Sequence, residues 1–234
     1  MWPFNTKSSL RESGFYSGYT EWHCHILPGV DDGIKTMEDA LKVLRLYEEV
    51  GIRTVWLTPH IMEDMPNTPA QLKERFAELQ QAYPGNIELH LAAENMLDAL
   101  FDERLEANEL LPIGEEGTHL LVETSYYNPP MDLSGILKRI RSKGYYPILA
   151  HPERYVYMGD EDYAELKEMG ILFQLNIPAL VGMYGERVQK KAQKLLKAGM
   201  YNYMGNDTHT YHFFATLVEM KLPVKELHKL SQIK

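Results

Sequence analysis

The chain has 234 residues, of which 44% are hydrophobic, and a formal net charge of −9. This is enough apolar material for one sizeable core, while the negative charge argues against a nucleic-acid partner held by bulk electrostatics. No segment approaches the roughly 20 consecutive apolar residues of a membrane-spanning helix. We therefore expect neither nucleic-acid binding nor stable membrane insertion.

The first 18 residues are predicted to be a loose polar leader, followed by a single domain over residues 19–234. They lack the basic region and apolar stretch of a signal peptide. The alternative for this leader is a weak membrane or partner contact through Trp2 and Phe4.

Short apolar segments then alternate with helical ones to the end of the chain. Strands are predicted at residues 19–22, 54–58, 87–93, 120–122, 147–150, 171–175 and 201–204. Helices are predicted at residues 36–50, 69–82, 96–108, 133–143, 160–169, 186–198 and 211–234. Strict alternation is typical of a parallel sheet, and no glycine-rich fingerprint of a dinucleotide-binding fold follows the first strand. The pattern predicts an α/β fold, a distorted seven-stranded (β/α)7 TIM-like barrel.

Residues that could bind metal follow six of the seven predicted strands. His23 and His25 are two residues apart just past the first strand, where both side chains point to the same side. The C-terminal ends of the strands form the functional face of α/β barrels. The other candidates at these ends are His60, Glu94, Glu123, His151, Asp207 and His209, with Asp32 on the loop after the first strand.

Five imidazoles and four carboxylates are too many ligands for one ion and suit two or three. Without a thiolate, the set fits Mn, Fe, Zn or Mg. Such a cluster would attract a phosphate dianion despite the acidic chain and would lower the pKa of a bridging water. Cys24 alternates with the two histidines, so we expect it to pack on the opposite side. As the one cysteine of the chain, it excludes an internal disulfide and fits a reducing, cytoplasmic location.

These motifs together resemble the polymerase-and-histidinol-phosphatase (PHP) superfamily and, within it, the capsule-associated bacterial protein-tyrosine phosphatases of the CpsB/YwqE type. The resemblance spans residues 20–210. It rests on His23-Cys-His25, Val-Asp-Asp-Gly at 30–33, Thr-Pro-His60, Ala-Glu94, Val-Glu123, Ala-His-Pro-Glu-Arg-Tyr at 150–155, and Asn-Asp-Thr-His209.

The resemblance implies a trinuclear site, with manganese as the first choice, whose ligands map to the nine residues above. It also implies attack of a metal-bridging hydroxide on phosphotyrosine, carried by a bacterial tyrosine kinase that regulates capsular or exopolysaccharide synthesis. A homo-oligomer is left open.

Arg154, three residues beyond His151, is predicted to bind two phosphate oxygens and to stabilise transition-state charge. An aromatic rim that stacks on phosphotyrosine is predicted from Tyr126, Tyr127 and Tyr155, with Tyr157 and Tyr184 as further candidates. The alternative for these tyrosines is aromatic packing against the barrel.

The chain departs from its relatives in two places: no arginine follows the Asp207-Thr208-His209 motif, and the segment after it is short, ending at Lys234. His212 is a possible substitute there, and a helix-start or core position is the alternative. Four lysines on one predicted helix are expected to form a solvated face: Lys190, Lys191, Lys194 and Lys197.

Three other functions are consistent with parts of the pattern. A small-molecule phosphatase, such as histidinol phosphatase, would use the same metal cluster. An amidohydrolase also carries two histidines after strand one, but many of these enzymes have a bridging lysine where this chain has Glu123. A catalytically silent PHP module that binds a partner is the third.

Overall fold

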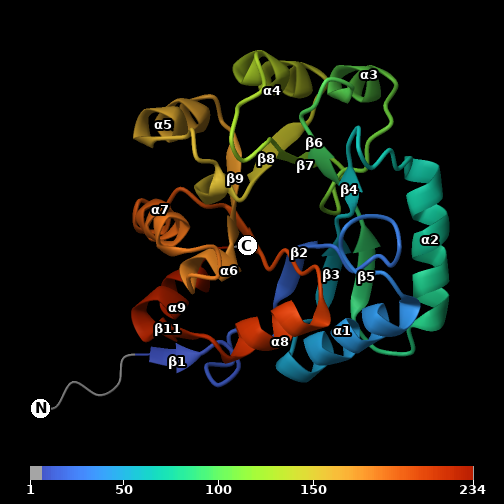
Figure 1. Cartoon of the computed structure of the whole chain (residues 1–234), viewed down its shortest axis with the longest axis vertical. Coiled ribbons are helices and arrows are strands. Elements are labelled where there is room, and N and C mark those ends of the chain that lie inside the picture. The colour runs from blue at the N-terminus through green and yellow to red at the C-terminus, as the bar shows by residue number, and fades with distance from the viewer. Residues whose placement is uncertain (1–6, 234) are drawn as a thin grey trace, which may run out of the picture.

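The computed structural model describes residues 7–233 (Figure 1). Trp2 and Phe4 lie outside the described residues. The strands are β1 Lys7–Ser9, β2 Thr20–Cys24, β3 Thr54–Leu57, β4 His60–Ile61, β5 Glu88–Leu91, β6 Glu94–Met96, β7 His119–Glu123, β8 Tyr146–Ala150, β9 Leu172–Asn176, β10 Tyr203–Gly205 and β11 Lys221–Pro223. The α-helices are α1 Met37–Val50, α2 Pro69–Ala82, α3 Phe101–Glu106, α4 Leu133–Ser142, α5 Asp160–Glu168, α6 Ile177–Leu180, α7 Glu186–Lys197, α8 Tyr211–Glu219 and α9 Val224–Leu230.

The strands that follow one another in the alternating pattern form two parallel sheets. One sheet has six strands in the order β10-β9-β8-β7-β6-β4, and the other has three in the order β2-β3-β5. The prediction of parallel α/β architecture is confirmed. The hydrogen-bond ladder, however, is divided between two sheets rather than forming the one closed sheet of seven strands that the sequence predicts.

The division falls just after the second and third predicted strands. The second, at 54–58, corresponds to β3, and β4 begins only after Pro59, which has no N–H to donate to a ladder. The third, at 87–93, corresponds to β5, and β6 follows it as a separate strand in the other sheet. At the other edge, the loop after β10 meets the end of β2, where Asp207 N donates to His23 O and His25 N donates to Thr208 O.

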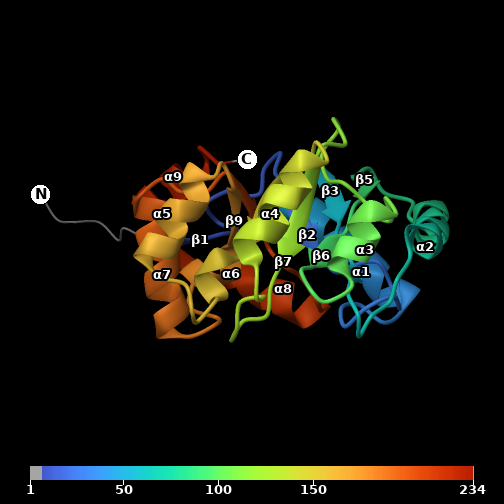
Figure 2. The same cartoon turned by 90° about the horizontal axis from the view of Figure 1, so that it is seen from above.

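Helices surround the strands, with α5 and α7 on one side and α2 on the opposite side (Figures 1 and 2). Local sequence signals set their ends. The Thr36 side chain accepts a hydrogen bond from Asp39 N at the start of α1, and Gly51 ends that helix with a left-handed φ of 103°. Thr68 and Gln71 form a capping box at the start of α2, with Pro69 at its first turn.

Three predicted segments differ from the structure. Residues 7–18 are not loose, because β1 pairs antiparallel with β11 and the side chains of Leu10 and Tyr16 are buried. The predicted helix 96–108 begins only at Phe101, since residues up to Met96 belong to β6. The final predicted helix is interrupted by β11, which separates α8 from α9.

Cys24 is buried in the main hydrophobic core, as its alternation with the histidines predicts. Within residues 7–233, no helix combines the length and apolar character needed to cross a membrane.

Candidate metal centre

His23 and His25, at the end of β2, turn their Nε2 atoms toward each other at 3.1 Å. The Nδ1 atom of each ring, on the side away from Nε2, has a hydrogen-bond partner. His25 Nδ1 lies 2.8 Å from Asp31 Oδ2, and His23 Nδ1 lies 2.6 Å from Gln174 Oε1. Both oxygens accept, so both Nδ1 atoms donate and both Nε2 lone pairs face the interior. This is how outer partners orient imidazole ligands in metal sites.

Glu94 lies at the centre of the histidines. Its Oε2 is 3.1 Å from His23 Nε2, 3.3 Å from His25 Nε2 and 3.3 Å from His60 Nδ1. Its Oε1 is 3.0 Å from His151 Nε2. Burial alone would raise the pKa of Glu94, but the neighbouring imidazoles hold it well below the ordinary value. A carboxylate with both oxygens among imidazoles could offer both of them to bound cations.

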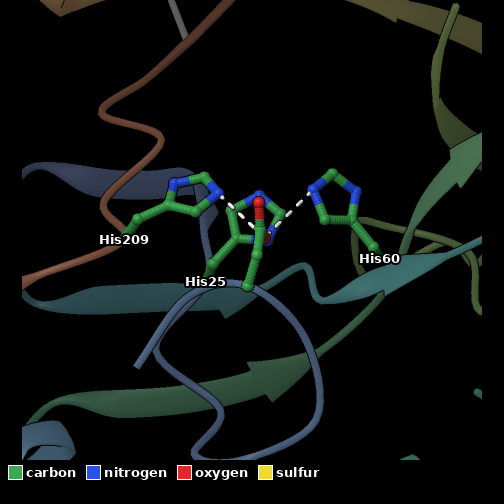
Figure 3. A group of neighbouring side chains, drawn as sticks. His25, His60 and His209 are labelled. Carbon is green, nitrogen blue, oxygen red and sulfur yellow. Dashed lines mark ion pairs between the residues drawn. The ribbon is translucent and has the colours of Figure 1, made fainter. Parts of the chain in front are cut away.

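All nine candidate ligands predicted from the sequence meet in one place. Four groups have ligand atoms within 4.8 Å of one another: His25 with Asp32, His60 and His209; His23 with His25 and Asp207; His23 with Glu94 and His151; and His60 with Glu94 and Glu123. Because several members belong to two groups, the groups form one continuous cluster. Figure 3 shows the imidazoles of His25, His60 and His209 directed toward a shared space from different parts of the chain.

The donor set fits divalent cations. Burial lowers the pKa of His23, but Glu94 and Asp207 outweigh it and raise that pKa to about 9. The carboxylates therefore favour positive charge among the imidazoles. Divalent ions would supply that positive charge to neutral rings.

Asp207 divides its two oxygens between the cluster and the mouth of the site. Oδ1 is 3.3 Å from His25 Nε2, whereas Oδ2 accepts from Arg154 Nη1 at 2.6 Å and from Asn176 Nδ2 at 3.0 Å. Asp207 has a φ of +52° and His151 a φ of +35°. Positive φ is unfavourable for residues other than glycine and is concentrated at functional sites.

Arg154 lies at the edge of this cluster, with 17% of its side chain exposed. Its guanidinium carbon is 4.4 Å from the ring centroid of Tyr126 and 4.4 Å from that of Tyr184. Tyr127 is 72% exposed.

Tyr155 does not belong to an aromatic rim, and this part of the prediction is wrong. Its side chain is fully buried, and its hydroxyl donates to Ala150 O and accepts from Thr124 N. The tyrosine directly follows the short 3-10 helix η1, Pro152–Arg154, and the next residue, Val156, donates its N–H to Tyr126 O in the loop after β7. Its neighbour Tyr157 contacts Thr124 Oγ1 through its hydroxyl at 2.5 Å.

Sequence reasoning missed several residues that support the cluster. The first is Asp31, next to the predicted ligand Asp32. The Asp31 carboxylate accepts hydrogen bonds from His25 Nδ1 and His60 N. Asp32 is half-exposed beside His60 and His209. Glu21 is also buried, and it accepts from His23 N and Asn206 N. Burial raises the pKa of Glu21 to about 7. Its position two residues before His23, on the same face of the strand, is the signal that could have found it.

The prediction of a solvated face of four lysines needs correction. Lys191 does not belong to it, because its Nζ donates to Tyr155 O and Met158 O and so ties α7 to the loop after η1. His212 is exposed in the first turn of α8, which agrees with the helix-start alternative, and it lies outside the cluster.

Comparison with known proteins assigns the chain to a family. The family described as capsular polysaccharide synthesis, CpsB/CapC, matches residues 19–218. The chain belongs to the CpsB/CapC family. The tyrosine-protein phosphatase YwqE of Bacillus subtilis is 28% identical over 193 residues, which cover 80% of this chain and 76% of that protein. The tyrosine-protein phosphatase CpsB of Streptococcus pneumoniae is 28% identical over 200 residues, with 80% and 81% covered.

A solved structure of this family has the same fold. The match is to crystal structures of YwqE and CpsB, which are described as metal-dependent tyrosine phosphatases. It has a TM-score of 0.78 at 24% identity and covers 92% of this chain and 87% of that chain. At this level of identity the match establishes the fold.

Proposed function

We propose that this protein is a metal-dependent phosphomonoesterase that hydrolyses phosphotyrosine on proteins. The observation that carries the proposal is the buried cluster of five imidazoles and four carboxylates with one guanidinium at its edge. The names of its family relatives, tyrosine-protein phosphatases, support the choice of substrate.

The proposed ligands are the nine clustered residues: His23, His25, Asp32, His60, Glu94, Glu123, His151, Asp207 and His209. We propose that they hold two or three divalent ions, with manganese first and iron, zinc or magnesium as alternatives. When bound, such ions would polarise the phosphoryl group and supply a nucleophilic water near neutral pH.

The residues of the chain itself would bind and orient the substrate. Arg154 carries a permanent positive charge and would contact the phosphoryl oxygens whose charge grows in the transition state. Asp207 would fix that guanidinium, and Asp31 and Gln174 would fix the imidazoles of His25 and His23. Among the tyrosines predicted to form the rim, Tyr127 is the exposed one, and we propose that it contacts the phenyl ring of the substrate.

The physiological substrate that we propose is a phosphotyrosine segment of a bacterial tyrosine kinase that controls capsular or exopolysaccharide synthesis, in the cytoplasm. The family's connection with capsular polysaccharide synthesis supports it. We also propose that the two sheets together form a single distorted (β/α)7 barrel domain. Two residues separate β3 from β4, and two separate β5 from β6, so each pair joins the two sheets directly. These short connections and the bridge between Cys24 and Thr208 support this view.

A panel of substrates tests the function. The protein is reconstituted with each metal in turn and assayed on a phosphotyrosine peptide, the matched phosphoserine peptide and histidinol phosphate. We expect the highest kcat/KM on phosphotyrosine, because its phosphate reaches farther past a rim to the cluster. A preference for histidinol phosphate would instead indicate a small-molecule phosphatase, and bound metal with no turnover would indicate a silent module.

Replacing Tyr127 with alanine tests its rim role separately. We expect the ratio of kcat/KM for phosphotyrosine to that for phosphoserine to fall while the metal content stays the same. An unchanged ratio would contradict the rim proposal.

A further inference from the structure

Two tyrosine rings lie against the guanidinium of Arg154. Tyr126 belongs to the loop after β7, and Tyr184 belongs to the loop between α6 and α7, so the two come from distant parts of the chain. The centroid of each ring is 4.4 Å from Arg154 Cζ. Aromatic faces at this distance attract a guanidinium and restrict its orientation.

The same arginine is held from a third direction by hydrogen bonds. Its Nη1 donates to Asp207 Oδ2 at 2.6 Å. Asn176 Nδ2 donates to that same oxygen at 3.0 Å and to the Tyr184 hydroxyl at 3.3 Å. Tyr184 therefore touches the guanidinium with its ring and is joined through Asn176 to the carboxylate that holds it.

This arrangement leaves one edge of the guanidinium free. Within residues 7–233, Nη1 is the nitrogen of Arg154 that has a hydrogen-bond partner, and neither Nε nor Nη2 has one. Nε and Nη2 form the edge that binds an oxyanion through two parallel hydrogen bonds. A side chain that is four-fifths buried and still has this edge unpaired is suited to receive a phosphoryl group.

We propose that Tyr184, together with Tyr126, is a positioning residue that fixes Arg154 for phosphate binding. This inference rests on the proposed function for its substrate but concerns the phosphate group alone. An arginine side chain has several rotatable bonds, and holding it in the binding orientation beforehand lowers the entropy lost on binding. This positioning role also changes the predicted role of Tyr126, because the ring face that lies against Arg154 is not available to stack on a substrate ring.

The first experiment uses inorganic phosphate as the probe, with titration calorimetry on the metal-loaded protein. We expect Tyr184→Leu to weaken phosphate binding about tenfold, because the cation–π contact is lost. Tyr184→Phe keeps the ring and should bind within about twofold of the unaltered protein. Tyr146→Leu is the matched control, since Tyr146 is half-exposed at the start of β8, away from the strand ends that carry the cluster. Metal content should be equal in all four proteins.

A double-mutant cycle separates positioning from a general structural role. Tyr184→Leu is combined with Arg154→Met, and kcat/KM on the phosphotyrosine peptide is compared in both backgrounds. If Tyr184 acts through the guanidinium, its replacement should cost about tenfold beside Arg154 and less than about twofold in the Arg154→Met background. Equal losses in the two backgrounds would overturn the inference.

The two readouts distinguish this inference from the proposed function. Phosphate binding that depends on Tyr184, without phosphotyrosine hydrolysis, would leave the positioning role intact and refute the substrate assignment. Hydrolysis of phosphotyrosine with phosphate binding unaffected by Tyr184→Leu would refute the positioning role. Failure of the metal-loaded protein to bind phosphate would refute it as well.

Discussion

Arg154 Nη1 and Asp207 Oδ2 are 2.6 Å apart, and this hydrogen-bonded ion pair joins the guanidinium at the mouth to the buried cluster. The other oxygen of Asp207 faces His23 and His25. The carboxylate therefore links the group proposed to bind phosphate to the groups proposed to bind metal. Replacing Arg154 should therefore have a different consequence from replacing Asp207.

We expect Asp207→Ala or His23→Ala to abolish turnover, because each removes a proposed metal ligand. Arg154→Ala should retain the metals and slow turnover by roughly 10²–10³, as expected when a group that stabilises transition-state charge is lost. Elemental analysis and kcat on the phosphotyrosine peptide provide the comparison. Full activity of Arg154→Ala would show that its phosphate role is wrong.

Asp31→Asn should weaken metal binding without removing a proposed ligand. Asp31 accepts from His25 Nδ1 at 2.8 Å and from His60 N at 3.1 Å. An amide is a poorer acceptor and no longer favours the same ring orientation, so metal affinity should fall roughly 10–100-fold. Competition with a coloured chelator measures this affinity. Asp39→Asn, on the exposed start of α1, is the control, and equal affinities for the two variants would contradict the role of Asp31.

The stability of the metal-free protein should fall at high pH. The pKa of His23 is about 9 in the folded chain against an ordinary value of 6.5. Because the folded value is the higher one, protonated His23 stabilises the fold fully below about pH 6.5, and this contribution is lost as the pH rises through about 9. Thermal melts at pH 7 and pH 10, with and without chelator, test this. We expect a larger drop in Tm for the chelated protein; equal drops would argue against the prediction.

Tyr155→Phe should reduce stability and leave substrate preference unchanged. The buried hydroxyl donates to Ala150 O at 2.9 Å and accepts from Thr124 N at 3.3 Å. Its removal leaves buried polar groups without a partner, which costs about 1–3 kcal/mol. Urea unfolding measures the loss in the free energy of unfolding. Tyr146→Phe, at a half-exposed position away from the cluster, is the control, and a changed preference for phosphotyrosine in Tyr155→Phe would restore Tyr155 to the rim.

The sequence by itself determined the alternation of strands and helices and the candidate ligands. Both follow from local chemistry. Thr36 and Gly51 mark the ends of α1 through hydrogen bonds and backbone conformation that depend on near neighbours. His23 and His25 share a side because strand residues two apart always do. Residues at strand ends could be predicted to meet because parallel strands bring those ends to one edge.

Tertiary structure decided how those ends are supported and what lies on the rim. The choice between Asp31 and Asp32 depended on which carboxylate meets His25, a contact set by the path of the loop. Tyr155 is buried because its hydroxyl meets Ala150 O and Thr124 N, which lie at the ends of two neighbouring strands. The pairing of Arg154 with Tyr184 joins η1 to a loop 30 residues farther along the chain, and no periodicity in the sequence indicates it. The local sequence pattern predicts which element carries a side chain. The residue that this side chain contacts depends on packing between segments that are distant in the chain.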